Sequence, residues 1–303
     1  MVVLGDSLSD GGYYGFKLTN TGEDLWHEYL ADRLGYERAT TTLFGFNGLN
    51  LAISASLIDD LQRQVNRLGS RYNFQASDIC TLWIGGNDIR GNPNQNMTPL
   101  ADEIGDIIGQ LHSIGIDHII VPNLLDIGAI PENPSSGTRA ERTAGTIAFN
   151  TALANELDAR ALTHSITIEQ LDIFELFDGM LFYAADYGFE NVTDTLQDSG
   201  SSQPDTYAFW DDIHPTTRGH FLVSSAAYAM LEPLAPIEVI SQSIEADGAL
   251  RQTWLADPGM THEILSGAQV DAMNTVNAFL GSPAYTVEIA PPSATSGFFK
   301  TRK

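Results

Sequence analysis

The chain has 303 residues, of which 43% are hydrophobic, and this length and composition suit one large domain or two unequal domains with a sizeable core. The 15 Lys and Arg residues against 39 Asp and Glu residues give a net charge of −24, which argues against binding to nucleic acid or to an anionic membrane surface. No apolar run reaches about 18 residues, so no transmembrane helix and no stable membrane insertion are expected.

The opening residues 2–10 predict a short buried strand that breaks into a tight turn, with a helix starting soon after. Ser7 then lies at the carboxyl end of a strand, where ligands bind in open α/β sheets. Backbone N–H groups near a helix N-terminus also favour negative charge. The alternative is a serine that only caps a helix, and this stretch by itself leaves both interpretations open.

Regular hydrophobic patterns then alternate along the chain. Helical periodicity predicts helices over residues 25–35, 57–68, 100–114 and 139–161. A continuous apolar run predicts a strand buried on both faces over residues 79–84, a second buried strand is predicted over residues 118–121, and a further strand over residues 165–171. This alternation predicts βαβ units and a mostly parallel sheet. His27 is expected on the surface of its helix. Cys80 is expected to be a buried structural thiol, and as the only cysteine it excludes an intrachain disulfide.

Three segments depart from this alternation. Residues 42–56 are interpreted as a loop that enters a helix. Residues 183–210 are polar and acidic, and we expect a solvated loop rather than a calcium site because no EF-hand spacing is present. From residue 237 the hydrophobic pattern alternates every second residue, which predicts a small β-rich domain over 237–303 beside a main domain over 1–234.

Three features carry chemistry. Ser7 offers a hydroxyl nucleophile, which needs a base beside it near neutral pH. Asp211 and His214 are three residues apart, so one turn brings the carboxylate to the imidazole, whose pKa suits a base. Asn87 follows a glycine pair at the end of a predicted strand, where its amide can donate to an oxyanion.

Each feature also has a simpler explanation. An Asp-x-x-His-Pro stretch is often only a helix start, and Gly-Gly-Asn-Asp is often only a turn. His220 is interpreted as a packing residue. Only the combination of the three features in this order favours catalysis.

The combination resembles the GDSL esterase/lipase family of the SGNH hydrolase superfamily over about residues 1–234. The matching stretches are Gly-Asp-Ser-Leu-Ser-Asp at 5–10, Gly-Gly-Asn-Asp at 85–88, Tyr-Gly-Phe-Glu-Asn-Val-Thr at 187–193 and Asp-Asp-Ile-His-Pro at 211–215. A further block of the family, Gly-x-Asn-x-Ala-x-x-Gly, is matched at Gly48, Asn50 and Ala52. Ala55 stands where the family has its last glycine.

The resemblance implies a flavodoxin-like three-layer α/β/α sandwich with a five-stranded parallel sheet. It implies Ser7 as nucleophile, His214 as base and Asp211 as the partner of the base. It also implies an oxyanion hole made by the Ser7 N–H, the Asn87 side chain and one N–H of the second block, which we assign to Ala55. Alanine keeps this N–H, and we expect the donor to survive if the backbone there does not require a positive φ.

The leading hypothesis is therefore a carboxyl-ester hydrolase that forms an acyl-enzyme on Ser7, uses no metal or cofactor, and acts on a small-molecule or lipid ester. The alternatives are an acyltransferase with the same site and a non-catalytic binding module with a degenerate site. The C-terminal segment resembles accessory β-domains of exported bacterial proteins, which favours a secreted or periplasmic protein whose leader has been removed. A cytoplasmic location stays open, because the first predicted strand starts at Val2 and no leader is visible.

Overall fold

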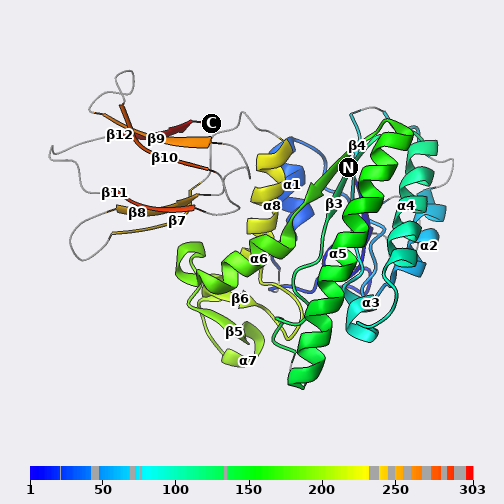
Figure 1. The fold of residues 1–303 in the computed structure, drawn as a ribbon, viewed down its shortest axis with the longest axis horizontal. Coiled ribbons are helices and arrows are strands. Elements are labelled where there is room, and N and C mark those ends of the chain that lie inside the picture. The colour runs from blue at the N-terminus through cyan, green and yellow to red at the C-terminus, as the bar shows by residue number, and fades with distance from the viewer. Residues whose placement is uncertain are drawn as a thin grey trace.

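The computed structural model describes residues 1–20, 22–41, 48–68, 72–75, 77–132 and 135–231, and the backbone of six strands between residues 239 and 302. Its centre is a parallel sheet of four strands in the order β1-β2-β3-β4 (Figure 1). The strands are β1 (Val2–Gly5), β2 (Ile79–Trp83), β3 (His118–Pro122) and β4 (Thr167–Leu171). Every residue of β1 and β2 is buried, because both strands lie under helices on the two faces of the sheet.

A fifth extended segment pairs with β1 on the edge opposite β2. The Val3 N–H donates to the Leu49 carbonyl at 2.8 Å, and the Leu51 N–H donates to the Val3 carbonyl at 2.8 Å. The expectation of a loop that enters a helix over residues 42–56 is confirmed for the described residues 48–56, which form no regular strand and lead into helical structure at Ile58, while residues 42–47 lie outside the described part. The edge of β1 offers free N–H and C=O groups, and this segment of small residues pairs with them. The composition of the segment does not predict this pairing.

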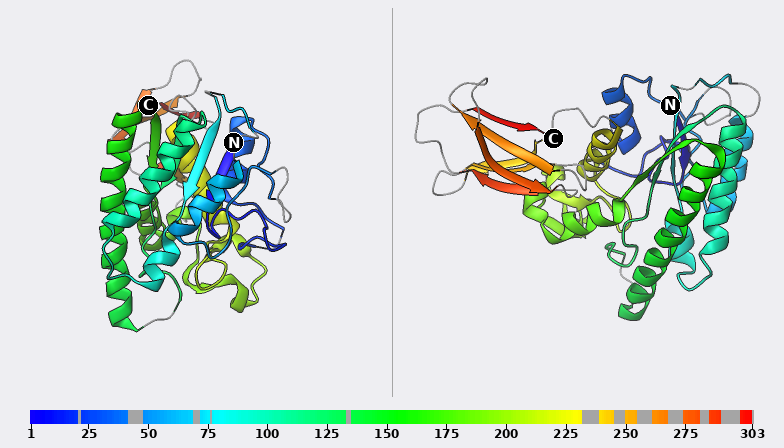
Figure 2. Two further views of the ribbon diagram at one scale, coloured as in Figure 1. Left: turned by 90° about the vertical axis from the view of Figure 1, so that its right-hand side faces the viewer. Right: turned by 45° about the horizontal axis from the view of Figure 1, so that its top comes forward.

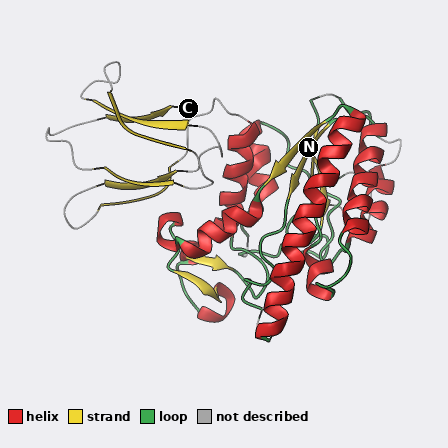
Figure 3. Cartoon of the chain, viewed as in Figure 1, coloured by secondary structure: helices red, strands yellow, loops and turns green. Residues whose placement is uncertain are grey.

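Helices cover both faces of the sheet. On one side α2 (Leu61–Leu68) packs on α4 (Thr98–Ser113), and α4 packs on α5 (Ser136–His164). On the other side α1 (Trp26–Leu34) packs on α8 (Thr217–Leu231). The labels of Figure 1 locate these helices, Figure 2 shows the ribbon from two further directions, and Figure 3 shows all helices in red. The predicted α/β/α layering is confirmed, whereas the parallel sheet has four strands in the described residues instead of the five that the resemblance implies, because the segment beside β1 forms only isolated bridges. None of the described helices is both long enough and apolar enough to cross a bilayer.

Three further short elements are η1 (Ile58–Asp60), α3 (Gly86–Gly91) and α6 (Ile173–Phe182). No helix follows Ser7 directly among the described residues; residues 6–9 form a turn, and α1 begins only at Trp26. The prediction of a helix soon after the turn is therefore wrong, because the N–H groups of Gly12 and Tyr13 donate to the Asp10 carboxylate at 2.9 and 2.6 Å instead of to carbonyls of a helical turn.

Residues 183–210 do not form a solvated loop. They hold η3 (Ala184–Tyr187), β5 (Asn191–Thr195), α7 (Leu196–Ser199), η4 (Pro204–Thr206) and β6 (Tyr207–Phe209), and the two strands pair in parallel. Tyr187 and Phe189 are buried in the core. These two aromatic side chains anchor the segment to the core, although its other residues are mostly polar.

His27 is likewise not a surface residue. Its side chain is 1% exposed, and its Nε2 lies 3.0 Å from the Ser9 carbonyl oxygen. Helix α1 is buried on two sides, because it packs on α8 and also on the sheet, where the Trp26 ring meets the Trp83 ring edge-on at 5.7 Å. Cys80 is buried in β2 as predicted.

The last part of the chain contains two antiparallel three-stranded sheets, in the orders β11-β8-β7 and β10-β9-β12. The strands are β7 (Val239–Ile244), β8 (Leu250–Trp254), β9 (Thr261–Gly267), β10 (Asn274–Leu280), β11 (Tyr285–Ile289) and β12 (Phe298–Arg302). The β content agrees with the alternating pattern of the sequence. That residues 237–303 form a separate domain stays a prediction.

Candidate active site

A hydroxyl, an imidazole and a carboxylate form one hydrogen-bonded chain. Ser7 Oγ lies 2.8 Å from His214 Nε2, and His214 Nδ1 lies 2.9 Å from each carboxylate oxygen of Asp211. Ser7 is 8% exposed and His214 is 6% exposed, so the contact between them is largely shielded from solvent. The fold thus brings together two side chains that are 207 residues apart in the sequence.

Gly5 and Gln64 fix the place where the chain turns toward Ser7. A Cβ atom on Gly5 would lie 2.2 Å from the Trp83 carbonyl oxygen, so the ends of β1 and β2 approach this closely only with glycine here. The buried Gln64 side chain accepts from the Gly5 N–H at 2.9 Å and donates to the Gly5 carbonyl at 2.8 Å. These bonds hold the residue two positions before Ser7.

Asp211 organises the turn that carries His214. One of its carboxylate oxygens accepts the main-chain N–H groups of Ile213 and His214 at 2.8 and 2.7 Å. Burial by itself raises the pKa of Asp211, but the hydrogen bonds and the nearby charge of His214 outweigh it and hold the pKa below its usual value. The carboxylate is therefore ionised and held against the imidazole.

Asn87 lies in α3, directly after the end of β2. Gly85 precedes this helix with φ of +110°, and a Cβ atom there would lie 2.8 Å from the Phe149 ring. Asn87 Nδ2 donates to the Ser56 carbonyl at 3.0 Å, and its Oδ1 accepts from Arg90 at 3.3 Å. Since an amide nitrogen carries two hydrogens, the second N–H of Asn87 is available to another acceptor.

Ala55 adopts a left-handed conformation, with φ of +66°. The backbone at this position thus does require the positive φ that glycine accepts most readily, and alanine adopts it at a cost of roughly 1–2 kcal/mol. Within the described parts of the chain, no acceptor bonds to the main-chain N–H of Ala55 or to that of Ser7. The segment around Ala55 lies beside Asn87, because Ser56 accepts the hydrogen bond from that side chain.

Sequence reasoning missed several residues that support these groups. The Asp10 carboxylate accepts both the N–H and the hydroxyl of Ser54. The Ser9 carbonyl accepts from Asn50 Nδ2 at 2.8 Å and faces Nε2 of the buried His27. Burial lowers the pKa of His27 to about 4, so the neutral ring donates to this carbonyl. Asp10 and Asn50 lie within stretches that match the family, so the motifs could have identified both residues. No sequence feature indicated that His27 is buried.

A second set of contacts missed by sequence reasoning supports Asn87. Arg90, which donates to its side chain, forms an ion pair with Glu132 at 2.6 Å. Arg142 binds the other oxygen of the same carboxylate. The N–H of Glu132 also donates to the Asp212 carbonyl at 2.8 Å, beside Asp211. Glu132 therefore connects Arg90, which donates to the Asn87 side chain, with the turn that carries His214.

Two more carboxyl groups are buried nearby. Burial raises the pKa of Asp6 to about 7, although Asp6 accepts one hydrogen bond from the Leu8 N–H at 3.1 Å. Burial also raises the pKa of Asp88 to about 6, and Asp88 accepts from the Ile58 N–H at 3.2 Å. Within the described part of the structure, neither carboxyl is hydrogen-bonded to the side chains of Ser7, His214 or Asp211.

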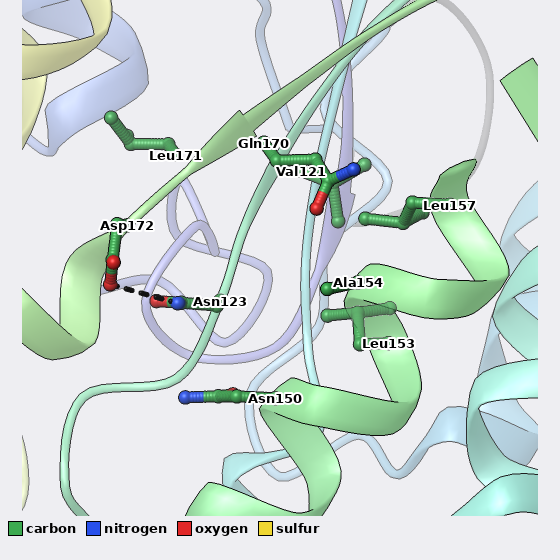
Figure 4. Close-up of a pocket in the computed structure, with 9 residues that line it drawn as sticks. All are labelled: Val121, Asn123, Asn150, Leu153, Ala154, Leu157, Gln170, Leu171 and Asp172. Atoms are coloured by element: carbon green, nitrogen blue, oxygen red, sulfur yellow. Dashed lines mark hydrogen bonds between the residues drawn. The ribbon is translucent and has the colours of Figure 1, made fainter. Parts of the chain in front are cut away.

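A pocket of about 360 Å³ adjoins Ala55 and is lined by residues 53–56, by Tyr13 and Tyr14, and by α2 side chains that include Arg63 and Arg67. Another pocket, of about 230 Å³, lies between α5 and the ends of β3 and β4. Its wall includes the Asn123–Asp172 hydrogen bond and several leucines of α5 and β4 (Figure 4). Neither pocket is lined by Ser7 or His214.

Comparison with known proteins gives the family. The chain is 24% identical over 216 residues to phosphatidylcholine-sterol acyltransferase of Aeromonas hydrophila, covering 63% of each protein. It is 22% identical over 257 residues to the secreted effector protein SseJ of Salmonella typhimurium, covering 73% of this chain and 60% of that protein. In both comparisons the chain spans less than two thirds of the relative's length.

Solved structures with a similar fold include a lipolytic protein of the G-D-S-L family from Veillonella parvula, at 16% identity and a TM-score of 0.46, covering 75% of this chain and 94% of that one. The acetylxylan esterase Axe2 of Geobacillus stearothermophilus has 16% identity and a TM-score of 0.46, covering 76% and 92%. The model of the GDSL-like lipase/acylhydrolase family matches residues 1–227. The chain therefore belongs to the GDSL-like lipase/acylhydrolase family.

Proposed function

We propose that this protein hydrolyses carboxyl esters through an acyl-enzyme formed on Ser7. The observation that carries the proposal is the hydrogen-bonded chain from Ser7 Oγ through the His214 ring to Asp211, with distances of 2.8 and 2.9 Å. A serine hydroxyl reacts near neutral pH when an imidazole takes its proton and a carboxylate holds that imidazole in the productive tautomer.

The reaction runs in two halves. Ser7 Oγ bonds to the ester carbonyl carbon while its proton passes to His214 Nε2, and Asp211 stabilises the imidazolium through Nδ1–H. The tetrahedral intermediate then breaks the bond to the leaving alcohol, which takes the proton from His214. A water molecule repeats the sequence: its proton passes to His214, its oxygen bonds to the acyl carbon, and Ser7 leaves with the proton.

The oxyanion of each intermediate is bound by three donors: the main-chain N–H groups of Ser7 and Ala55 and the second side-chain N–H of Asn87. Support comes from the free state of both main-chain N–H groups in the described structure and from the contact of Asn87 with Ser56. Loss of one such donor typically costs about 2.7–4 kcal/mol of transition-state stabilisation.

The test is turnover of a neutral short-chain aryl ester by Ser7→Ala, His214→Gln and Asn87→Ala. The first two variants are expected to lose turnover by at least about 10³-fold with unchanged thermal unfolding, and Asn87→Ala by about 10²–10³-fold. Wild-type protein is expected to react covalently with a fluorophosphonate at Ser7. An active Ser7→Ala variant would refute the assignment. Wild-type protein that neither turns over the ester nor reacts with the probe would favour a non-catalytic binding module.

Acyl transfer is the second candidate, because one relative carries the name phosphatidylcholine-sterol acyltransferase. The same acyl-enzyme would then pass its acyl group to an alcohol instead of water. Product analysis with water and a soluble alcohol in competition separates the two activities. If the ratio of ester product to acid product equals that of the uncatalysed reaction, the enzyme does not prefer the alcohol over water as acyl acceptor.

Two further proposals concern the whole chain. Secretion is supported by the name of the Salmonella relative, a secreted effector. A separate β-rich domain over residues 237–303 is supported by the change of sequence pattern at residue 237. Deletion after Pro236 is expected to leave the thermal unfolding and ester turnover of residues 1–236 close to those of the full chain. A truncated chain that does not fold would contradict the domain boundary.

A further inference from the structure

The turn that carries Ser7 is closed two residues after the proposed nucleophile. The Ser9 N–H donates to the Asp6 carbonyl at 3.1 Å, so Ser7 and Leu8 occupy the two central positions of a four-residue turn. The backbone angles of this turn set the directions of the Ser7 hydroxyl and the Ser7 N–H. Contacts that hold Ser9 in place therefore also hold the direction of both groups.

Three side chains converge on Ser9, which is fully buried. Trp26 Nε1 donates to the Ser9 hydroxyl at 3.1 Å. His27 Nε2 and Asn50 Nδ2 lie 3.0 and 2.8 Å from the Ser9 carbonyl oxygen. A carbonyl oxygen has two lone pairs, so these two contacts use its full capacity as an acceptor. Trp26 and His27 are neighbours on α1, and this helix therefore holds both the hydroxyl and the carbonyl of Ser9.

His27 is a buried titratable group that the proposed reaction does not use. Because a carbonyl oxygen only accepts, the contact of 3.0 Å with Ser9 requires a hydrogen on Nε2. The ring is neutral, since burial lowers its pKa to about 4. A neutral imidazole held in one tautomer supplies a directed N–H, which suits a geometric role better than proton transfer.

The same helix is also tied to the turn that carries His214. The Tyr29 hydroxyl lies 2.9 Å from Thr217 Oγ1. Thr217 Oγ1 donates its single hydrogen to the Asp24 carbonyl at 3.1 Å, so Tyr29 is the donor in this contact. Thr217 is the first residue of α8 and follows His214 by three residues. Helix α1 thus contacts the nucleophile turn through its first two residues and the histidine turn through the start of α8.

We propose that Trp26 and His27 are positioning residues for the nucleophile, because they fix Ser9 to the helix that is also tied to the His214 turn. The proposal rests on the ester hydrolysis proposed above and adds two residues to its machinery. Trp26 is 0% and His27 is 1% exposed, so neither side chain contacts the substrate. Both act through Ser9 on the distance between Ser7 Oγ and His214 Nε2.

The first experiment measures kcat and KM for a neutral short-chain aryl ester and the rate at which a fluorophosphonate modifies Ser7. His27→Leu removes the donor and keeps a buried side chain. It is expected to lower kcat and the rate of modification by about tenfold each with KM unchanged, because a displaced nucleophile costs rate rather than binding. His27→Gln places an amide N–H near the former position of Nε2 and is expected to recover most of this loss.

A double-mutant cycle tests the second contact. Trp26→Phe and Ser9→Ala each delete the bond between the indole and the hydroxyl, and each is expected to lower kcat by about threefold. Because both remove the same bond, the double variant is expected to lose no more than the larger single loss. Losses that multiply would overturn the role of Trp26. Trp26→Phe keeps an aromatic ring in the core, so it also provides the test if His27→Leu does not fold, and a wild-type kcat in this variant would then overturn the proposal.

The matched control is His220→Leu, which replaces a second fully buried imidazole on α8. Neither ring nitrogen of His220 has a hydrogen-bond partner among the described residues, so this substitution is expected to leave kcat unchanged. A merely structural role of His27 would lower the thermal stability of His27→Leu and leave the kcat of the folded protein at the wild-type value.

The pH dependence of kcat/KM separates positioning from an electrostatic effect. Its acid limb reports the ionisation of the catalytic base, and the limb is expected at the same pH in His27→Leu and wild type, since His27 is neutral there. A shift of this limb in His27→Leu would overturn the positioning role.

Failure of the proposed function looks different from failure of this proposal. In the first case wild-type protein neither hydrolyses the ester nor reacts with the fluorophosphonate, or Ser7→Ala is as active as wild type. In the second case wild type is active and Ser7→Ala is inactive, but folded His27→Leu has the kcat of wild type.

Discussion

The Asp10 carboxylate holds Ser54 by two hydrogen bonds, at 2.8 Å from its main-chain N–H and at 2.6 Å from its hydroxyl. The other carboxylate oxygen of Asp10 accepts the N–H groups of Gly12 and Tyr13 at 2.9 and 2.6 Å. One buried side chain therefore ties the loop that follows Ser7 to the segment that carries Ala55. Two groups of the proposed site come from these two segments, so their relative position depends on Asp10.

Asp10→Ala is expected to lower kcat for a neutral aryl ester by about 10²-fold, because a displaced oxyanion donor is worth about as much as a missing one. Ser54→Ala removes only the hydroxyl bond and is expected to have a smaller effect. Ser113→Ala removes a similar hydroxyl bond at the far end of α4 and serves as control. Turnover of Asp10→Ala equal to that of wild type, with the fold intact, would show that the segment holds its position without this carboxylate.

Ala55→Gly is expected to raise the free energy of unfolding by about 0.5–1 kcal/mol. Glycine removes the energetic cost of a positive φ. Glycine also increases the conformational entropy of the unfolded chain, which offsets part of the gain in folding free energy. Ser165 has φ of +56° at the end of α5, so Ser165→Gly is the matched control. Chemical denaturation is expected to show a gain for both variants, whereas only Ala55→Gly changes the kinetics of ester hydrolysis. A loss of stability in Ala55→Gly alone would mean that the methyl group makes packing contacts that outweigh the strain.

His220→Leu is expected to reduce the loss of stability in acid. His220 is fully buried, neither ring nitrogen has a partner in the described structure, and burial lowers its pKa to about 3. The unfolded chain therefore binds a proton near pH 6.5 that the folded chain excludes, and stability falls as the pH drops from about 6.5 toward 3.

At pH 5 this effect amounts to about 2 kcal/mol for His220, so the variant is expected to gain that much more over wild type at pH 5 than at pH 7.5. The measurement is denaturant unfolding at the two pH values. His27 contributes an effect of the same sign in both proteins, and the difference between them isolates His220. A gain of equal size at both pH values would contradict the assigned cause.

Arg90→Gln is expected to lower kcat by about tenfold with little change in KM, because Arg90 donates to the Asn87 amide, which we propose as an oxyanion donor. A double-mutant cycle distinguishes this role from a structural one. In the Asn87→Ala background the Arg90 substitution should have almost no further effect on kcat. Additive losses would assign Arg90 to the stability of the fold instead, which thermal unfolding of the single variant would also register.

Much of the central fold could be predicted from local patterns. Apolar runs identified β2 and β3, because strands buried on both faces have few polar positions. The strand β4 was predicted as well, although only its last residue is buried. Helical periodicity identified α1, α2, α4 and α5 to within a few residues. The motifs also selected Ser7, Asn87, Asp211 and His214 as the residues to examine. What these features share is that the determining residues are neighbours in the sequence.

Long-range packing decided the rest. Residues 49–53 are extended because β1 offers them a free edge, and His27 is buried because α1 packs against two layers at once. The positive φ of Ala55 follows from the path that this segment takes past Asp10, and a residue type alone does not report it. The sequence by itself determined which side chains are candidates for chemistry and which segments form the four strands of the central sheet. Only the tertiary structure decided that Ser7 and His214 meet at 2.8 Å, because that distance depends on contacts between segments about 200 residues apart.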